Sequence, residues 1–291
     1  MSTQNPKLPL GKPLAFAIVA AALALATAPA SAALIAHYEL DSDVTDATGN
    51  GNDGTLSGTT SFSTDVPAAI SGSTHSLQFN DGGAANDGFV DLPEGDATEP
   101  DNDLFIDGSY TIAAWVKFDA RSGTGGGAAK IVGNFKLSGG FQHNYLLRVL
   151  HSDHGSIPDQ VGFIARDASG DTQSLLDPTV PNLGEWIHYA ATFDASDGAM
   201  KLYRDGSQVD SQTLSNFDGF DATDQIASLG DADSDNHNES QNFNGKLDDV
   251  RIYNEALDAD GIGALIPEPA TLALLGLGGA VMLGRRDRRK N

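Results

Sequence analysis

The chain has 291 residues, no cysteine and a formal net charge of −23. The lack of cysteine excludes disulfides, zinc–thiolate sites and thiol catalysis. Residues 33–266 hold 10 of the 17 basic and 38 of the 40 acidic side chains, and a region this acidic repels the phosphate backbone of nucleic acids. It would attract divalent cations instead, and hard oxygen ligands suit calcium.

Residues 1–32 have the order of a secretory signal peptide. Lys7 and Lys12 form a basic start, residues 14–26 are apolar, and Ala30-Ser31-Ala32 provides small residues for cleavage after Ala32. The alternative is a retained membrane helix, but the apolar run is shorter than the ~20 residues that span a bilayer. We therefore expect export and removal of this segment.

Residues 33–266 alternate short β-rich runs with turns rich in Gly, Asp, Asn and Ser. Apolar and other residues alternate with a period of two in residues 110–118, and Asp205-Gly206 predicts a tight hairpin turn between two strands. The one convincing helix is residues 258–265. This pattern predicts an all-β antiparallel sandwich. The expected strands are 34–40, 76–79, 89–92, 110–118, 130–135, 145–150, 161–166, 186–193, 200–204, 208–213, 226–229 and 246–253.

An ordered series of sequence blocks in this region resembles the laminin-G-like, concanavalin A-like domains. The resemblance implies a jelly-roll of two curved antiparallel sheets and a role in binding carbohydrate or protein, without naming the ligand. The acidic segments 96–107 and 231–239 depart from the usual pattern. The matching blocks are His-Tyr-Glu-Leu-Asp at 37–41, the Gly/Asn-rich segment 46–56, and residues 76–79, 110–117, 184–193, 201–206 and 244–253.

The first candidate site is a calcium site. Asp46, Asn50 and Asn52 lie in a compact loop of oxygen ligands with glycines, and the resemblance implies a calcium ion near this loop and the last long strand. Alternation places Asp248 on the side of Val250 and Ile252, where an unpaired carboxylate would need a cation. The alternative is a simple turn, with Asp248 paired to Arg251 or to a backbone amide.

Two acidic motifs are weaker candidates. Residues 231–239 place oxygen-bearing side chains at alternate positions, but Asn236 and Asn242 stand where an EF-hand loop has glycine and a bidentate acid. Glu94, Asp96 and Glu99 have the spacing of laminarinase-type glycoside hydrolases, which share the fold. In those enzymes the motif lies on a strand, whereas these residues have the composition of a loop. We therefore predict no catalytic residue and no enzyme activity.

Two tryptophans form a candidate sugar platform. Alternation puts Trp115 opposite Ile112 and Val116, and puts Trp186 opposite Ile187. An exposed indole on that face could stack on a sugar ring. The alternative is that neighbouring strands cover both rings.

The C-terminal residues 267–291 have three parts in fixed order. Pro267-Glu268-Pro269 precedes the uncharged, Leu/Ala/Gly-rich residues 271–284 and the basic residues 285–290. Basic residues after an apolar segment stop translocation. The order resembles the PEP-CTERM sorting signal of Gram-negative bacteria. It implies transient anchoring in the inner membrane, processing by an exosortase-type enzyme, and delivery to the outer surface or extracellular matrix. The alternative is a permanent anchor.

Together these features predict an exported, surface-sorted binding module for extracellular polysaccharide or a surface protein, stabilised by calcium. One alternative is an architectural matrix protein that binds cations and water without a discrete ligand. The other is a glycoside hydrolase of the laminarinase type.

Overall fold

The computed structural model describes residues 33–79, 88–93, 104–120, 128–136, 142–150, 155, 158–220, 225–230 and 243–267. The predicted signal peptide and the sorting tail after Pro267 lie outside these ranges. Among the helices of the described ranges, none is both long and apolar enough to cross a membrane.

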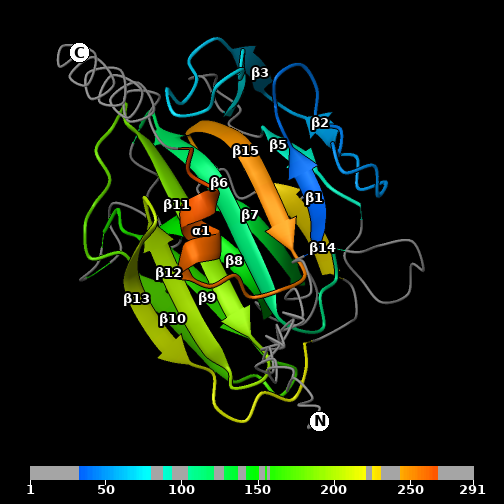
Figure 1. The fold of residues 1–291 in the computed structure, drawn as a ribbon, viewed down its shortest axis with the longest axis vertical. Helices are drawn as coiled ribbons and strands as arrows, with labels where there is room; N and C mark the ends of the chain where they lie inside the picture. The colour runs from blue at the N-terminus through cyan, green and yellow to red at the C-terminus, as the bar shows by residue number, and fades with distance from the viewer. Residues whose placement is uncertain are drawn as a thin grey trace, which may run out of the picture. The chain divides into compact units, whose positions relative to one another are not determined.

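The described residues form fifteen strands and one helix, arranged as two stacked antiparallel sheets (Figure 1). The first sheet, called sheet A, has the order β13 (Ser207–Thr213), β12 (Ala199–Arg204), β11 (Trp186–Asp194), β6 (Tyr110–Phe118), β15 (Gly245–Tyr253), β4 (Ser76–Phe79) and β3 (Thr60–Ser63), and β1 (Leu34–Tyr38) pairs with β15. The second, sheet B, has the order β10 (Thr172–Leu176), β9 (Val161–Arg166), β8 (Gln142–Leu150), β7 (Ala128–Lys136), β14 (Gln225–Leu229), β5 (Phe89–Asp91) and β2 (Thr55–Ser57). The predicted all-β jelly-roll is confirmed.

The core lies between the two sheets and follows the alternation of the strands. In β6, Ile112 and Val116 face this core, while Ala113 and Trp115 face away from it. Tyr110 lies where rings from both sheets and a loop meet, with ring centroids 5.3 to 6.2 Å away. Burial of large side chains along every long strand supplies the stabilisation that holds the sheets together.

The predicted hairpin between β12 and β13 is confirmed. Asp205 and Gly206 have φ angles of 48° and 77°, and Arg204 pairs with Ser207. Two consecutive positive φ angles define the turn that matches the twist of paired strands. The predicted helix is also confirmed as α1 (Ala259–Ala264), capped by Asp258, which accepts a hydrogen bond from the Gly261 amide at 2.8 Å.

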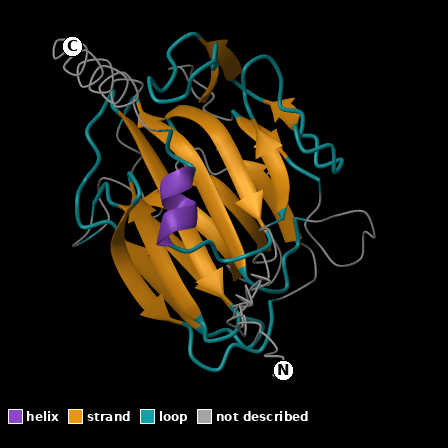
Figure 2. Ribbon diagram, in the orientation of Figure 1, coloured by secondary structure: helices purple, strands orange, loops and turns teal. Residues whose placement is uncertain are grey.

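Sheet A is covered on its outer face as well as on its core face. Helix α1 lies across the strands of this sheet, and its Ile262 packs with Ala113, Ala190 and Tyr203 (Figure 2). Residues 64–75, the β3–β4 connection, cover another part of the same face through hydrogen bonds from Trp186 and Lys117 to Asp65. Strands β6, β11 and β15 are therefore largely buried on both sides.

The predicted orientation of Asp248 is wrong, because β15 contains a bulge. Leu247 and Ile252 face the core, although they are five residues apart. The register shifts between Asp248 and Arg251, and Asp249 adopts a φ angle of 50°. One extra residue reverses the alternation. Asp248 consequently shares the outer face of sheet A with its cross-strand partner Trp115.

Candidate functional site

The loop that contains Asp46 is organised by the Asp46 carboxylate. Its Oδ1 accepts hydrogen bonds from the His37 and Thr48 amides, each at 3.0 Å, and the Thr48 hydroxyl donates to it at 2.7 Å. The Asn52 amide donates to Oδ2 at 3.4 Å. Burial acts to raise the pKa of Asp46, but these donors outweigh it and hold the pKa below its usual value. Both carboxylate oxygens are thus already engaged by donors from the loop itself and from β1.

Asn50 and Asn52 tie the same loop to the start of β1. The Asn52 side-chain amide donates to the Ile35 carbonyl oxygen at 2.8 Å, and that of Asn50 donates to the same oxygen at 3.0 Å. The Tyr38 hydroxyl donates to the Asn52 carbonyl oxygen at 2.7 Å. Both amides therefore fix the turn, which is the alternative that the sequence left open for them.

Asp248 belongs to a different group of contacts on the outer face of sheet A. Its Oδ2 accepts from the Ser73 hydroxyl at 3.0 Å, while its Oδ1 has no hydrogen-bond partner and the residue is 1% exposed. Burial is the largest cause that raises the pKa of Asp248 to about 7, and it outweighs the Ser73 hydroxyl and the Asp249 backbone amide, which act to lower the pKa. The charges of Asp249 and Asp41 act in the same direction as burial.

The four predicted calcium ligands therefore do not form one set. The hydrogen bonds of Asp46 and Asp248 involve different residues, and Asp46 has its oxygens engaged by N–H and O–H donors. Among the described residues, no group of three or more His, Asp and Glu side chains could hold a metal ion. Because calcium takes six to eight oxygen ligands, these residues as placed do not fit it. Calcium binding stays a prediction from the sequence.

The two tryptophans lie on the outer face of sheet A, as alternation predicts. Trp115 is 7% exposed and its ring contacts His188 edge-on, with centroids 5.4 Å apart. Burial lowers the pKa of His188 to about 4, so this imidazole is neutral at pH 7. Trp186 is half-buried and donates from Nε1 to Asp65 Oδ1 at 3.1 Å. As placed, Trp115 leaves too little of its ring open for a sugar to stack on it.

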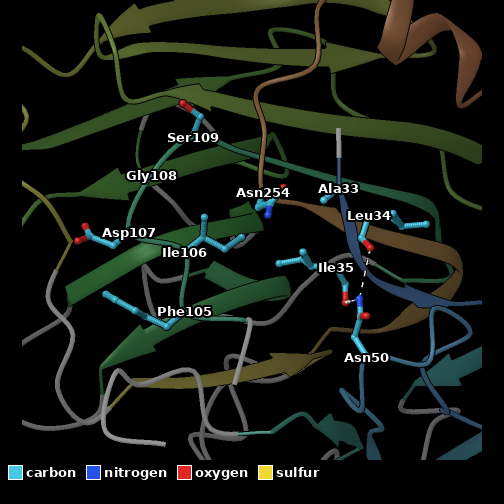
Figure 3. A pocket seen from close by; sticks show the side chains of 10 residues that line it. All are labelled: Ala33, Leu34, Ile35, Asn50, Phe105, Ile106, Asp107, Gly108, Ser109 and Asn254. Carbon is cyan, nitrogen blue, oxygen red and sulfur yellow. Dashed lines mark hydrogen bonds between the residues drawn. The ribbon is translucent and has the colours of Figure 1, made fainter. Parts of the chain in front are cut away.

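An open hollow of about 560 Å³ lies at one end of the sandwich and was not apparent in the sequence. We call it the rim hollow. One wall is formed by the start of β1 with Asn50, and the other by residues 105–109 before β6 (Figure 3). Figure 3 shows Asn50 turned back onto the backbone of Leu34 and Ile35. The lining residues are Ala33, Leu34, Ile35, Asn50, Phe105, Ile106, Asp107, Gly108, Ser109 and Asn254.

The rim hollow combines apolar surface with groups that form hydrogen bonds. Phe105 is half-buried, whereas Asp107 and Asn254 are exposed. Asp107 Oδ1 accepts from the Phe220 backbone amide at 3.1 Å. The Asn254 backbone amide donates to the Ala33 carbonyl oxygen at 3.2 Å. The exposed lining of the hollow is more polar than apolar, so hydrogen bonds would contribute most of the contacts to a ligand there.

A smaller hollow of about 350 Å³ lies on the outer face of sheet A, between β15 and the β3–β4 connection. We call it the acidic hollow, because Glu39, Asp41, Asp248 and Asp249 all line it. Sequence reasoning singled out only Asp248 among these residues.

Several residues considered from the sequence, either as weak candidates or as part of the sorting signal, lie outside the described ranges. These are Glu94, Asp96 and Glu99, the acidic segment 231–239, and Glu268 and Pro269 of the sorting signal. Pro267 is described and is exposed.

Solved structures of domains from other proteins share this fold. Domain 4 of an extracellular GH43 arabinanase from Geobacillus stearothermophilus, in complex with arabinotriose, is 22% identical with a TM-score of 0.55, over 81% of this chain and 98% of that chain. The receptor binding domain of botulinum neurotoxin C/D mosaic serotype is 16% identical with a TM-score of 0.57, over 80% and 50%. The binding domain of botulinum neurotoxin serotype D in complex with N-acetylneuraminic acid is 15% identical with a TM-score of 0.56, over 80% of this chain and 50% of that chain.

The chain spans about half the length of the neurotoxin domains, and likeness at these identities shows the fold alone. No curated protein matches the chain. The PEP-CTERM protein-sorting motif matches residues 265–290, which marks the protein for export and targeting to the cell envelope. The family model of the concanavalin A-like lectin/glucanases superfamily matches residues 85–263. The chain therefore belongs to the concanavalin A-like lectin/glucanase superfamily.

Proposed function

We propose that this protein is a non-enzymatic binding module that holds extracellular polysaccharide at the cell surface, with the rim hollow as its sugar site. The observation that carries the proposal is the hollow itself, because about 560 Å³ falls within the ~300–1,000 Å³ of typical ligand sites. The proposal is supported by the fold family, which is lectin-like, and by the sorting motif, which targets the domain to the envelope.

The chemistry of the rim hollow suits a sugar. Phe105 offers an apolar surface for the C–H face of a sugar ring, and the exposed Asn254 side chain can both donate to and accept from hydroxyl groups. Asp107 adds a carboxylate that can accept from a hydroxyl. The arabinanase domain of similar fold was solved with arabinotriose, so arabino-oligosaccharides are sensible first probes.

The sorting tail completes the proposal. An exosortase-type enzyme would recognise Pro267-Glu268-Pro269 while residues 271–284 hold the chain briefly in the inner membrane, and removal of the tail would release the domain to the outer surface. Support for this route comes from the matched motif and from the basic residues that end the chain.

The test is binding of the full-length chain to arrayed polysaccharides that include arabinan. We expect saturable binding that falls about tenfold in Phe105→Ala and in Asn254→Ala, since each removes a contact worth roughly 1.4 kcal/mol. Leu183→Ala is the matched control, because Leu183 is also an exposed apolar residue, at 44%, and does not line the hollow. Equal binding by all variants would exclude the rim hollow as the site.

A further inference from the structure

The acidic hollow on the outer face of sheet A carries an excess of negative charge. Its two basic groups are both engaged by one acid: Asp249 Oδ1 accepts from His37 Nε2 at 2.7 Å and from Arg251 Nε at 2.9 Å. Within the described part of the chain, this leaves Glu39, Asp41 and Asp248 without an ion-pair partner of their own.

Asp41 is fixed by neutral donors. Its Oδ1 accepts from the Thr74 amide at 2.6 Å and the His75 amide at 2.9 Å. Both amides belong to the β3–β4 connection, so this carboxylate stays ionised and in place beside Asp248, whose charge it opposes.

Asp248 adds an observation that is independent of the acidic character of the hollow. It lines the hollow and is 1% exposed, yet its Oδ1 has no hydrogen-bond partner. Leaving a buried carboxylate oxygen without a donor is costly, more so beside other carboxylates. A ligand that brings a donor and a positive charge would relieve both costs.

The carboxylates of the acidic hollow suit an ammonium group better than a metal ion. Calcium needs six to eight oxygens, and no described group of His, Asp and Glu side chains is arranged for a metal. A primary ammonium group could donate one N–H to Asp248 Oδ1, while its positive charge is balanced by the nearby acids Asp41 and Glu39, which line the same hollow. Charge-assisted hydrogen bonds of this kind are short and strong.

The geometry points to the acidic hollow as a binding site for the protonated amino group of an amino sugar, received by Asp248 with Asp41 and Glu39 supplying charge. The assignment rests on the proposed function only in taking a glycan as the ligand, because the rim hollow is a separate site. A lysine side chain carries the same ammonium group, and the experiment separates the two sources.

The test compares binding of a glucosamine tetramer and of the N-acetylglucosamine tetramer to the full-length chain by calorimetry at about pH 6.5. The two probes differ in whether the nitrogen carries a charge. We expect the glucosamine tetramer to bind at least about tenfold more tightly, and we expect that preference to vanish in Asp248→Asn. Glu39→Gln, at an exposed position, should weaken binding in the same direction.

Asp171→Asn is the matched control, because Asp171 is exposed and lies at the turn between β9 and β10 of the other sheet. It should bind like the wild type. Equal affinity for the two tetramers, or unchanged binding in both Asp248→Asn and Glu39→Gln, would overturn the inference. Binding of a lysine peptide without the glucosamine tetramer would overturn the glycan assignment. Polysaccharide binding that Phe105→Ala weakens would be unaffected by any of these results, so the two proposals fail separately.

Discussion

The indole Nε1 of Trp186 donates a hydrogen bond to Oδ1 of Asp65 at 3.1 Å, which ties β11 to the β3–β4 connection. The same carboxylate accepts from Lys117 Nζ at 2.6 Å and lies 3.5 Å from Lys246 Nζ. One acid therefore gathers groups from three strands of sheet A and holds the connection on its outer face.

Asp65→Ala should loosen this connection. Because the Asp65 side chain is 38% exposed, its ion pairs are screened, and we expect a loss on the order of 1 kcal/mol in the free energy of unfolding. Urea denaturation measures the loss, and Trp186 fluorescence should shift in the native state. Asp171→Ala should change neither. A native fluorescence spectrum of Asp65→Ala identical to that of the wild type would contradict the hydrogen bond between Trp186 and Asp65.

Asp46→Asn should destabilise the loop of residues 46–54, because an amide offers one acceptor oxygen where the carboxylate receives amide and hydroxyl donors on both. We expect a loss of about 1–3 kcal/mol by urea denaturation. The loss should be the same with added calcium and with EDTA. Calcium stabilisation of the wild type that disappears in Asp46→Asn would show that an ion displaces those donors, and would support the calcium prediction.

Asp248 should make the folded protein less stable as the pH rises. Its pKa moves from the ordinary value of 3.8 to about 7, so the folded state binds this proton more tightly than the unfolded state does. The contribution of Asp248 to the free energy of unfolding is fully present below about pH 4 and is lost as the pH rises through about 7. Its size is on the order of a few kcal/mol. Unfolding midpoints at about pH 5 and pH 8 measure it, and Asp248→Asn should show a smaller difference between them. Parallel pH profiles would contradict the burial of the charge.

Substitutions at two glycines allow the energetic cost of backbone strain to be measured apart from the cost of a steric clash. Gly184 and Gly198 have φ angles of 77° and 72°, but a Cβ at Gly184 meets nothing within 4 Å, whereas one at Gly198 would lie 2.1 Å from the Leu214 carbonyl oxygen. Gly184→Ala should cost about 1 kcal/mol from strain alone. Gly198→Ala should cost roughly 3 kcal/mol or more, because the β11–β12 turn and Leu214 must move apart. Thermal or urea unfolding of both variants gives the comparison, and equal losses would contradict the close approach.

The fold was largely predictable, because the long strands have apolar residues at the period that a sandwich needs. Strand β6 and helix α1 follow directly from residue pattern and capping. Strands β2, β3 and β10 were not predicted. They are short and partly exposed, so their residues show no apolar alternation that would distinguish them from loops in the sequence.

The sites were less predictable, because they depend on where separate segments meet. Asp248 was assigned to the wrong face, since a bulge has no signature in a sequence pattern of period two. The rim hollow arises where residues 105–109 approach the start of β1, and neither segment has a recognisable binding motif. What the sequence could supply was the residue types in the loops, such as Asp46 and Asn50, but not their partners.

Ala33 is a wall residue of the rim hollow, and its carbonyl oxygen accepts from the Asn254 amide. Cleavage after Ala32 would therefore place a new α-amino group, with its positive charge, at the edge of the proposed sugar site. A precursor that kept its leader would carry peptide bonds there instead. Export would then do more than transport the domain, because the last step of leader removal would also finish the ligand site.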